Sequence, residues 1–299
     1  MQITWQNTAE PVSMKRFLTT HGISMRLIKE IKHGSGEFVV NGDARTGEIT
    51  VATGDTAGII LPAEAADETV ASSDQPIDVL YEDANWLVVN KPAGLTSVPG
   101  PSNQTDTLVN RVKGHLVREG AENLKSHLIT RLDRDTSGLV LIAKHRVAQG
   151  MLTVEPTAHT LRKTYLAWVS GEVTPAKGTI KAPIGRPTES PRREVMDTGQ
   201  KAITKYWVEQ TFGDQVTEVK LGLVTGRTHQ IRVHLTHLGH PLLGDQLYGG
   251  DQQLIKRQAL HASTLTFKDP FSGERREFEA PLPADLQALV QTLTAMTNA

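Results

Sequence analysis

The feature that most limits the fold of this chain is a small acidic stretch that divides it into two unequal parts. Residues 63–76 read AEAADETVASSDQP and show no hydrophobic periodicity. Stretches of this composition usually connect domains, because they bury too little apolar surface to fold by themselves. The sequence therefore predicts a small unit over residues 1–62, an acidic linker over 63–76 and a larger body over 77–299.

Composition restricts the class of protein. Of the 299 residues, 38% are hydrophobic and 22% are charged, which is typical of a folded globular chain. There is no cysteine, so disulfides and thiolate chemistry are excluded. No apolar run approaches the roughly 20 residues that cross a bilayer, and the N-terminal residues lack the pattern of a secretory signal. We therefore expect a cytoplasmic protein that does not bind membranes.

Charge is spread unevenly although the net charge is only −1. Residues 1–62 carry six acidic and six basic side chains, and residues 63–85 carry seven acidic and no basic ones. Residues 86–299 carry 20 acidic and 26 basic side chains. A basic body behind an acidic linker is compatible with a polyanionic partner, but a mildly basic enzyme without such a partner explains the charges equally well.

The N-terminal unit has the pattern of two short helices and several short strands. Apolar residues recur at partly helical spacing over 14–31, and Gly22 is expected to separate two helices. Strand-like runs follow at 37–40, 48–52 and 58–61, and Asn41-Gly42 is typical of a hairpin turn.

This order of elements, FLTTHGISMRLIKEIKHG followed by FVVNG, resembles an S4 domain, a small RNA-binding module. The resemblance implies that Arg26, Lys29 and Lys32 of the second helix face RNA. An ordinary solvated helix face accounts for the same three residues about as well.

Strand-like runs dominate the body, at residues 86–89, 139–143, 165–169 and 219–224. Helical patterns interrupt them near 108–118 and 230–238. The strands do not alternate regularly with long helices, so the pattern favours an α+β fold over a doubly wound α/β fold.

The segment most informative about chemistry is TRLDRDTSGLVLIAK, residues 130–144. Its apolar run predicts a buried strand that is entered through a turn, and Asp135 is explained by local bonding in that turn. Asp133 has no such explanation. With Arg131 and Arg134 beside it, Asp133 would stay ionised and could act as a nucleophile. On these residues alone, a surface salt bridge is the favoured interpretation.

The same segment resembles the central motif of the RluA family of pseudouridine synthases. The resemblance implies that Asp133 is the catalytic carboxylate and that Arg131 helps to displace the target base. Thr130 stands where the family usually has histidine. The run NKPAGL resembles the first motif of the family, with Val98-Pro99 in place of the usual His-Pro, and we interpret this run mainly as a turn.

Two further segments match the family in the same order along the chain. KTYLAWVSG places the family's active-site tyrosine at Tyr165, which alone would be interpreted as a half-buried strand aromatic. TGRTHQIRVHLTHLGH, residues 225–240, continues as PLLGDQLYG and has the pattern of a strand end followed by a helix. Arg232 lies in the first turn of that helix, and the resemblance makes it the partner of Asp133. Arg227 is expected to contact phosphate or substrate, with a solvated turn residue as the alternative.

Four histidines of this last segment raise the question of a metal site. His229, His234, His237 and His240 do not form the His-Glu-x-x-His pattern of a helical zinc site, and His234 and His237 have no evident third ligand. We expect no metal. The sequence also contains no phosphate-binding glycine-lysine loop and no dinucleotide fingerprint.

The resemblance covers about residues 78–285 and implies a mixed, mainly antiparallel sheet. The implied activity is the isomerisation of uridine to pseudouridine in structured RNA, by a monomer. We expect ribosomal RNA as the first candidate substrate and transfer RNA as the second. The reaction involves no redox step and loses no group, so no cofactor is expected. Two alternatives stay open: a non-catalytic RNA-binding factor of ribosome assembly on the same fold, and a carboxylate hydrolase such as a glycosidase.

Overall fold

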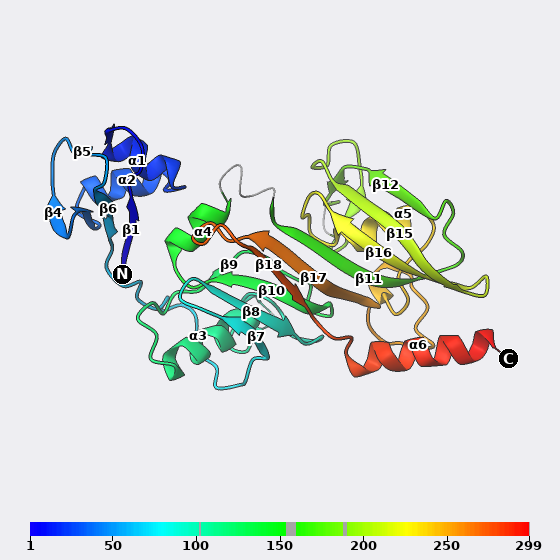
Figure 1. Cartoon of the computed structure of the whole chain (residues 1–299). Helices are drawn as coiled ribbons and strands as arrows, with labels where there is room; N and C mark the ends of the chain where they lie inside the picture. The colour runs from blue at the N-terminus through cyan, green and yellow to red at the C-terminus, as the bar shows by residue number, and fades with distance from the viewer. Residues whose placement is uncertain (102, 154–159, 188–189, 299) are drawn as a thin grey trace.

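The N-terminal unit is a small α/β module at one end of the molecule (Figure 1). The computed structural model describes residues 1–101, 103–153, 160–187 and 190–298. An antiparallel sheet of order β1-β6-β3-β4 forms the module together with two helices, and β2 pairs with β5. The elements are β1 (Gln2–Gln6), β2 (Val12–Ser13), α1 (Met14–Thr20), α2 (Met25–Lys32), β3 (Glu37–Val40), β4 (Asp43–Arg45), β5 (Thr50–Val51) and β6 (Thr56–Ile60).

The two turns predicted for this module are present. Gly22 has a φ of 82° between α1 and α2, a conformation that favours glycine. Asn41 and Gly42 have φ values of 53° and 91° between β3 and β4, as a tight hairpin turn requires. The strand expected over 48–52 is shorter and spans only Thr50–Val51.

The module is attached to the body through an apolar contact. Val147 and Met151 of α4 (Arg146–Thr153) belong to the same buried cluster as the core of the module. Arg146 also pairs with Glu30 of α2, with a distance of 3.5 Å from Nη1 to Oε2. The N-terminal unit is therefore packed on the body through shared core residues.

The segment predicted as a linker also lies against the body. The Glu64 carboxylate accepts the backbone N–H of Arg146 at 2.7 Å, and its oxygens lie 3.2 Å from His127 Nε2. Asn110 of α3 (Leu108–Arg118) donates its side-chain N–H to the carbonyl of Ala71 at 2.8 Å. An acidic, apolar-poor composition prevents the segment from forming a core of its own, but its backbone groups still bind to a neighbouring helix.

The body is built on a ten-stranded, mainly antiparallel sheet, which confirms the α+β fold class. Its main path has the order β12-β15-β16-β11-β17-β10-β8-β7, with β18 on β17 and β9 on β10. The strands are β7 (Val79–Glu82), β8 (Trp86–Lys91), β9 (His127–Leu128), β10 (Ser137–Ala143), β11 (Arg162–Ser170), β12 (Lys177–Lys181), β15 (Ile203–Phe212), β16 (Val216–Leu223), β17 (Leu260–Lys268) and β18 (Arg275–Glu279). The remaining elements are the β13–β14 hairpin (Ile184–Gly185, Glu194–Val195), α5 (Gln230–His237), the 3-10 helix η2 (Gln246–Tyr248) and α6 (Ala284–Thr297).

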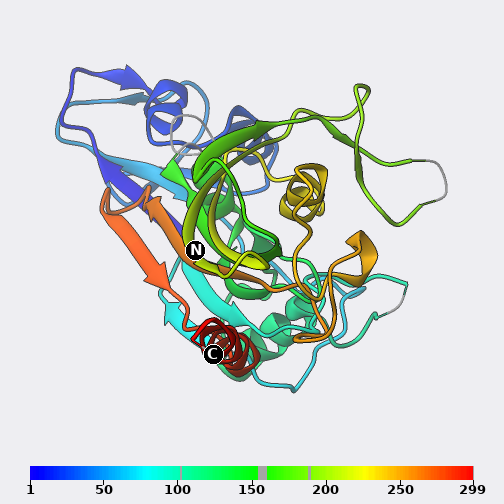
Figure 2. The same cartoon turned by 90° about the vertical axis from the view of Figure 1, so that its right-hand side faces the viewer.

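The sheet is curved and has a separate core on each face. Strands β11, β15 and β16 bend around α5, which lies on their concave side (Figure 2). Alternation along β11 shows the division: Tyr165 and Ala167 point into the large core that contains α5 residues, whereas Trp168 points into the core formed with α6. In the same way, β10 contributes Val140 to the first face and Leu141 to the other.

Two neighbouring strands at the centre of the sheet run parallel. β10 and β17 are paired through Ser137 with His261 and through Gly138 with Ala262, whereas the other described pairings in this sheet are antiparallel. Gly138 has a φ of 112°, and a Cβ there would lie 2.3 Å from the carbonyl oxygen of Ala262. The two parallel strands therefore begin side by side, which brings the loops that precede them to one edge of the sheet.

Over the described parts of the chain, no helix combines the length and apolarity that a membrane span needs.

Candidate active site

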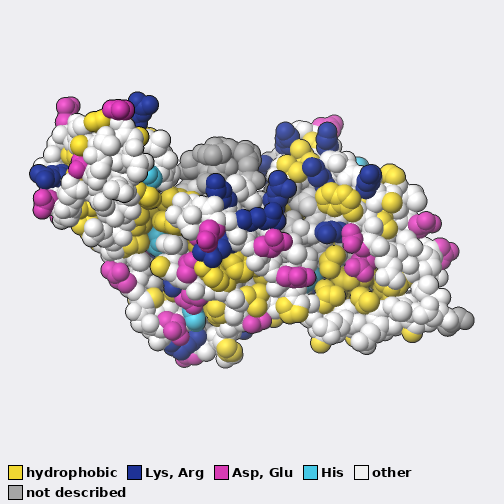
Figure 3. Space-filling view, viewed as in Figure 1, with side chains coloured by type: hydrophobic (Ala, Val, Ile, Leu, Met, Phe, Trp, Pro, Cys, Tyr) yellow, Lys and Arg dark blue, Asp and Glu magenta, His cyan; other side chains and the backbone are white. Residues whose placement is uncertain are grey.

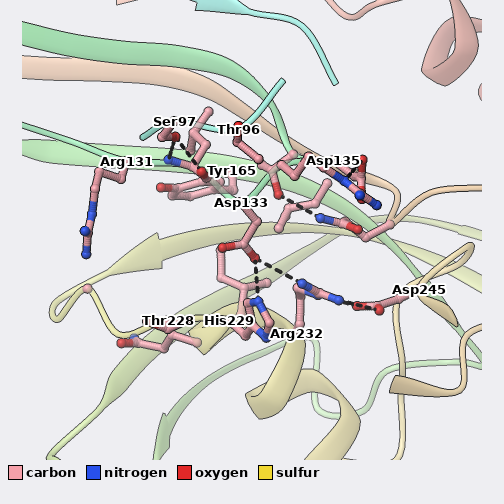
Figure 4. Close-up of a pocket in the computed structure, with 18 of the residues that line it drawn as sticks. Thr96, Ser97, Arg131, Asp133, Asp135, Tyr165, Thr228, His229, Arg232 and Asp245 are labelled. Atoms are coloured by element: carbon pink, nitrogen blue, oxygen red, sulfur yellow. Dashed lines mark hydrogen bonds and ion pairs between the residues drawn. The ribbon is translucent and has the colours of Figure 1, made fainter. Parts of the chain in front are cut away.

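A cavity of about 1160 Å³ opens where the two parallel strands begin (Figure 4). Its lining comes from the loop before β10, from β11, from the start of α5, and from the segments around η2 and before β17. Small-molecule sites commonly measure about 300–1,000 Å³, so this cavity has room for a nucleotide and part of its neighbours.

The loop that carries Asp133 is fixed on both sides of that residue. The Ser97 hydroxyl donates to the carbonyl of Leu132 at 2.6 Å and accepts the N–H of Leu132 at 3.2 Å. The Lys91 ammonium donates to the carbonyl of Arg134 at 2.9 Å. Asp133 thus lies between two peptide units that are held by hydrogen bonds. Its side chain is 26% exposed and lines the cavity.

Lys91 has a structural role that the sequence interpretation missed. The residue is fully buried, and its ammonium also donates to the carbonyls of Pro92 and Leu95, both at 2.8 Å. Burial lowers the pKa of Lys91 to about 7. We interpreted the NKPAGL run mainly as a turn, but its lysine also ties that turn to the Asp133 loop.

The immediate neighbours of Asp133 do not pair with it, although the sequence places a guanidinium on each side. The Arg134 guanidinium binds the Asp135 carboxylate instead, with Nε and Nη2 at 3.0 and 2.9 Å from its oxygens. The turn is closed by backbone atoms, because the Thr136 N–H donates to the Asp133 carbonyl at 3.1 Å. Arg131 is exposed and forms no ion pair with any described residue. In a tight turn, adjacent side chains point in different directions, so closeness in sequence did not give contact.

The charge partner of Asp133 comes from α5. Arg232 Nη1 donates to Asp133 Oδ2 at 3.2 Å, and the rest of the guanidinium binds Asp245 through Nε at 2.6 Å and Nη2 at 2.8 Å. The side chains of Arg232 and Asp245 are only 7% and 1% exposed. Burial alone would lower the pKa of Arg232, but the two carboxylates outweigh it and raise that pKa. The guanidinium is therefore a fixed cation that presents one N–H to Asp133.

Asp245 was not singled out in the sequence, although it lies in the PLLGDQLYG run that follows the helix. It precedes η2 and accepts the backbone N–H of Tyr248 at 3.3 Å. The Tyr248 ring in turn lies beneath the Arg232 guanidinium, with 4.9 Å from Cζ to the ring centroid. A carboxylate directly after a glycine is common in turns, so this position carried no signal of its own.

His229 also faces Asp133. Its Nε2 lies 3.9 Å from Asp133 Oδ2, and its Nδ1 lies 3.0 Å from the hydroxyl of Tyr248. Burial lowers the pKa of His229 and outweighs the attraction of Asp133, so the ring is neutral at neutral pH. From the sequence, we considered His229 only as a metal ligand.

Tyr165 forms part of the cavity wall opposite α5. Its ring lies close to Asp133 in the close-up (Figure 4), and the residue is 4% exposed. Burial, with the charge of Asp133 as a second cause, raises the pKa of the Tyr165 phenol. No described residue forms a hydrogen bond with its hydroxyl. The structure therefore brings Asp133, Tyr165 and Arg232 to one cavity from three distant parts of the sequence.

Comparison with known proteins decides the family. A family model described as RNA pseudouridylate synthase matches residues 85–237. An uncharacterized RNA pseudouridine synthase, YjbO of Bacillus subtilis (strain 168), is 41% identical over 281 residues, which cover 94% of this chain and 99% of that protein. The chain belongs to the RNA pseudouridylate synthase family. Ribosomal large subunit pseudouridine synthase D of Xanthomonas campestris pv. campestris is 39% identical over 285 residues, which cover 90% of this chain and 84% of that protein.

The fold of this family member agrees with solved structures. The human RNA pseudouridylate synthase domain containing 1 protein aligns with a TM-score of 0.57 and 28% identity, over 75% of this chain and 97% of that one. The sequence-based assignment to the RluA/RluD-type family is confirmed. So is the enzyme class, an isomerase that converts uridine in RNA to pseudouridine.

The other predicted contact residues of the synthase lie outside this group of three. Arg131 and Arg227 both line the cavity, and both are exposed. The Arg227 Nε donates to the carbonyl of Lys201 at 3.1 Å, which fixes its stem beside the loop before α5. Arg26, Lys29 and Lys32 are exposed on α2 of the N-terminal unit, and Arg26 forms an i,i+4 pair with Glu30 at 2.9 Å.

Two of the other histidines in this segment, His234 and His240, have individual protein partners. His234 is buried, with Nδ1 2.8 Å from the Thr204 hydroxyl and Nε2 2.9 Å from the Ala182 carbonyl. His240 Nδ1 lies 2.9 Å from the carbonyl of Ser170. Within the described ranges, no group of three or more His, Cys, Asp or Glu side chains is arranged to hold a metal ion.

Proposed function

We propose that this enzyme isomerises specific uridines of ribosomal RNA and that Asp133 is its catalytic carboxylate. The observation that carries the proposal is an ion pair inside a cavity large enough for a nucleotide. The partly exposed carboxylate of Asp133 pairs with the buried guanidinium of Arg232, which also binds Asp245. The reaction breaks the C1′–N1 bond of uridine and joins C1′ to C5. It needs a group that reacts with the sugar or the base, a pocket that excludes water, and a means to turn the freed uracil.

The geometry of Asp133 suggests which of its oxygens reacts. Oδ2 is bound by Arg232 and approached by His229, whereas Oδ1 forms no hydrogen bond or ion pair with a described residue. We assign to Oδ1 the reaction with the nucleotide, whether by attack on the sugar, by attack on the uracil, or by removal of a sugar proton. In all three cases Arg232 holds Oδ2 through its charge-assisted hydrogen bond.

Tyr165 is proposed to stack on the extruded base. A buried, uncharged phenol ring offers the flat apolar surface that bases prefer. A second role open to Tyr165 is assistance in proton removal at C5. Because its pKa is raised, the hydroxyl is protonated at neutral pH, and we therefore propose stacking as its main role.

RNA has to release the target nucleotide before this site can act on it. Turning a base out of its stack costs a few kcal/mol, and a side chain that fills the gap offsets part of this cost. Arg131 has the required exposure and lack of an ion-pair partner among the described residues, so we propose it for that role. Arg227 is proposed to contact an RNA phosphate.

Ribosomal RNA is the proposed target because relatives that cover most of this chain are named ribosomal large subunit pseudouridine synthases. Transfer RNA stays the second candidate. We further propose that the N-terminal unit is an S4-like RNA-binding domain that uses Arg26, Lys29 and Lys32. Lys and Arg side chains lie on this unit and in a band across the upper part of the body on the face in Figure 3, which supports contacts from both parts.

The alternatives weighed from the sequence predict different products. Incubation with RNA that carries labelled uridine, followed by digestion to nucleosides, separates them. Pseudouridine supports the proposal, unchanged uridine supports an RNA-binding assembly factor, and free uracil supports a hydrolase. Mapping pseudouridines in the RNA of cells that lack the protein identifies the target, and loss of a ribosomal site is the result that we expect.

A further inference from the structure

His229 occupies a backbone conformation that needs an explanation. Its φ of 57° and ψ of 18° lie in the left-handed region, which is sterically disfavoured for a residue with a Cβ. His229 precedes the first turn of α5, but its side chain makes no capping hydrogen bond to that helix. Strained conformations of this kind persist where the surroundings determine them, and they are concentrated at functional sites.

The contacts of Tyr248 indicate which ring nitrogen of His229 carries the proton. The Tyr248 hydroxyl accepts the backbone N–H of Arg193 at 2.8 Å. Among the described residues, the acceptor within reach of its own proton is His229 Nδ1, 3.0 Å away. If the hydroxyl donates to Nδ1, the ring proton of the neutral imidazole is on Nε2. That nitrogen is the one that faces Asp133.

The charged groups around His229 favour the same arrangement. Asp133 and Asp245 attract a proton to the ring, whereas Arg232 and Arg193 repel it, and burial favours the neutral form. A neutral ring with its proton on Nε2 can donate one hydrogen bond to Asp133. It does not add a second positive charge beside Arg232.

We propose that His229 is a positioning residue for the isomerisation: its Nε2–H binds Asp133 Oδ2 beside Arg232 and keeps Oδ1 turned toward the nucleotide. The inference rests on the proposed role of Asp133. The Nε2–Oδ2 distance of 3.9 Å is longer than a hydrogen bond, and contacts of this kind shorten when substrate fills a site. With Arg232 and His229 both bound to Oδ2, the Asp133 carboxylate is restricted in rotation more than by Arg232 alone.

The test compares two substitutions that share the backbone strain and differ in the donor. His229→Gln keeps an N–H at about the reach of Nε2, whereas His229→Met has a similar volume and no donor. Both side chains are unbranched at Cβ, so the left-handed conformation disfavours them to a similar degree. Turnover, KM for the RNA and thermal stability are measured for both variants, for wild type and for Asp133→Asn.

We expect His229→Met to lose about 10²-fold in kcat, with KM near the wild-type value, as for removal of one preorganised donor. His229→Gln should recover most of that loss. Nitrogen NMR of the labelled wild-type imidazole should show a neutral ring that is protonated at Nε2, and Tyr248→Phe should weaken this preference. The wild-type spectrum does not depend on whether a variant folds.

The inference is overturned by full activity of His229→Met, by an equal loss in both variants, or by a wild-type ring protonated at Nδ1. Failure of this inference differs from failure of the proposed function. An inactive Asp133→Asn together with a fully active His229→Met removes only the role of His229. An active Asp133→Asn removes the assignment of Asp133 itself.

Discussion

Replacing Asp245 by asparagine removes the charge that holds Arg232 in place. Asp245 accepts two hydrogen bonds from the guanidinium, and both side chains are almost fully buried. The amide keeps one acceptor oxygen but directs its NH₂ group at a guanidinium N–H. Arg232 is then left with one counter-charge, the partly exposed Asp133 at 3.2 Å.

The expected loss of stability follows from this geometry. Breaking a buried ion pair by removal of one partner costs about 3–5 kcal/mol. We expect the lower end, about 3 kcal/mol, because Asp133 still compensates part of the charge. For a chain of 299 residues, an unfolding entropy of about 2.1 cal/mol/K per residue converts this loss into a fall in Tm of roughly 5 °C. Activity should fall by about 10- to 10²-fold, because a displaced Arg232 no longer orients Asp133, the carboxylate that we propose reacts.

A matched control is available on the surface. Arg257 binds Asp285 with the same two-point geometry, at 2.6 and 2.9 Å, but that carboxylate is 47% exposed. Asp285→Asn should therefore cost no more than about 1 kcal/mol. Thermal denaturation and release of tritium from C5-labelled uridine in RNA measure the two effects. Equal stability losses in the two variants, or unchanged activity in Asp245→Asn, would refute the reasoning.

Three further predictions concern the scaffold. Lys91→Met should destabilise the protein by several kcal/mol, because each buried carbonyl left without its donor costs about 1–3 kcal/mol. Denaturant unfolding measures the loss of stability, and a loss below about 1 kcal/mol contradicts the prediction. Burial raises the pKa of Glu64, but hydrogen bonds from His127 and Arg146 outweigh it and lower that pKa from 4.5. The ionised Glu64 carboxylate therefore stabilises the folded protein above pH 4.5, and this stabilisation is lost as pH falls through the lower pKa of the folded state. The difference in Tm between wild type and Glu64→Gln should accordingly shrink on acidification. A difference that stays constant with pH contradicts this. Deletion of residues 1–62 should leave a more stable body than deletion of 1–74, because the shorter deletion keeps the Glu64 and Ala71 contacts; equal Tm values would mean that those contacts contribute nothing. Weaker RNA binding with a shallower salt dependence is expected for both deletions.

Local patterns allowed the sequence to predict the elements that carry the site. The run before the buried strand at 139–143 placed Asp133 at the mouth of β10, and the helical spacing after residue 229 placed Arg232 in the first turn of α5. The sequence also placed Tyr165 on a strand, as a half-buried aromatic, and the structure has it buried on β11. The family resemblance supplied the roles, because these patterns alone favoured a surface salt bridge for Asp133 and a half-buried strand aromatic for Tyr165.

The missed residues act through contacts between distant parts of the chain. Lys91 binds a carbonyl 43 residues away, and Asp245 binds a guanidinium 13 residues earlier, so neither has a local signature. The position of His229 depends on Tyr248, on a different element. The segment over 63–76 has the composition of a free linker, and its attachment follows from hydrogen bonds that α3 and β9 provide.

The central claim is that the carboxylate of Asp133 performs the chemistry, and it is tested most directly by Asp133→Asn beside Asp135→Asn. Both substitutions make the same chemical change two residues apart, and the Asp135 carboxylate binds Arg134 on the surface of the loop. Pseudouridine formation is measured by nucleoside analysis after incubation with the RNA target, and binding and Tm are measured in parallel. We predict that Asp133→Asn abolishes the product while folding and RNA binding persist, and that Asp135→Asn remains active. Pseudouridine formed by Asp133→Asn at a rate near that of wild type would contradict the account.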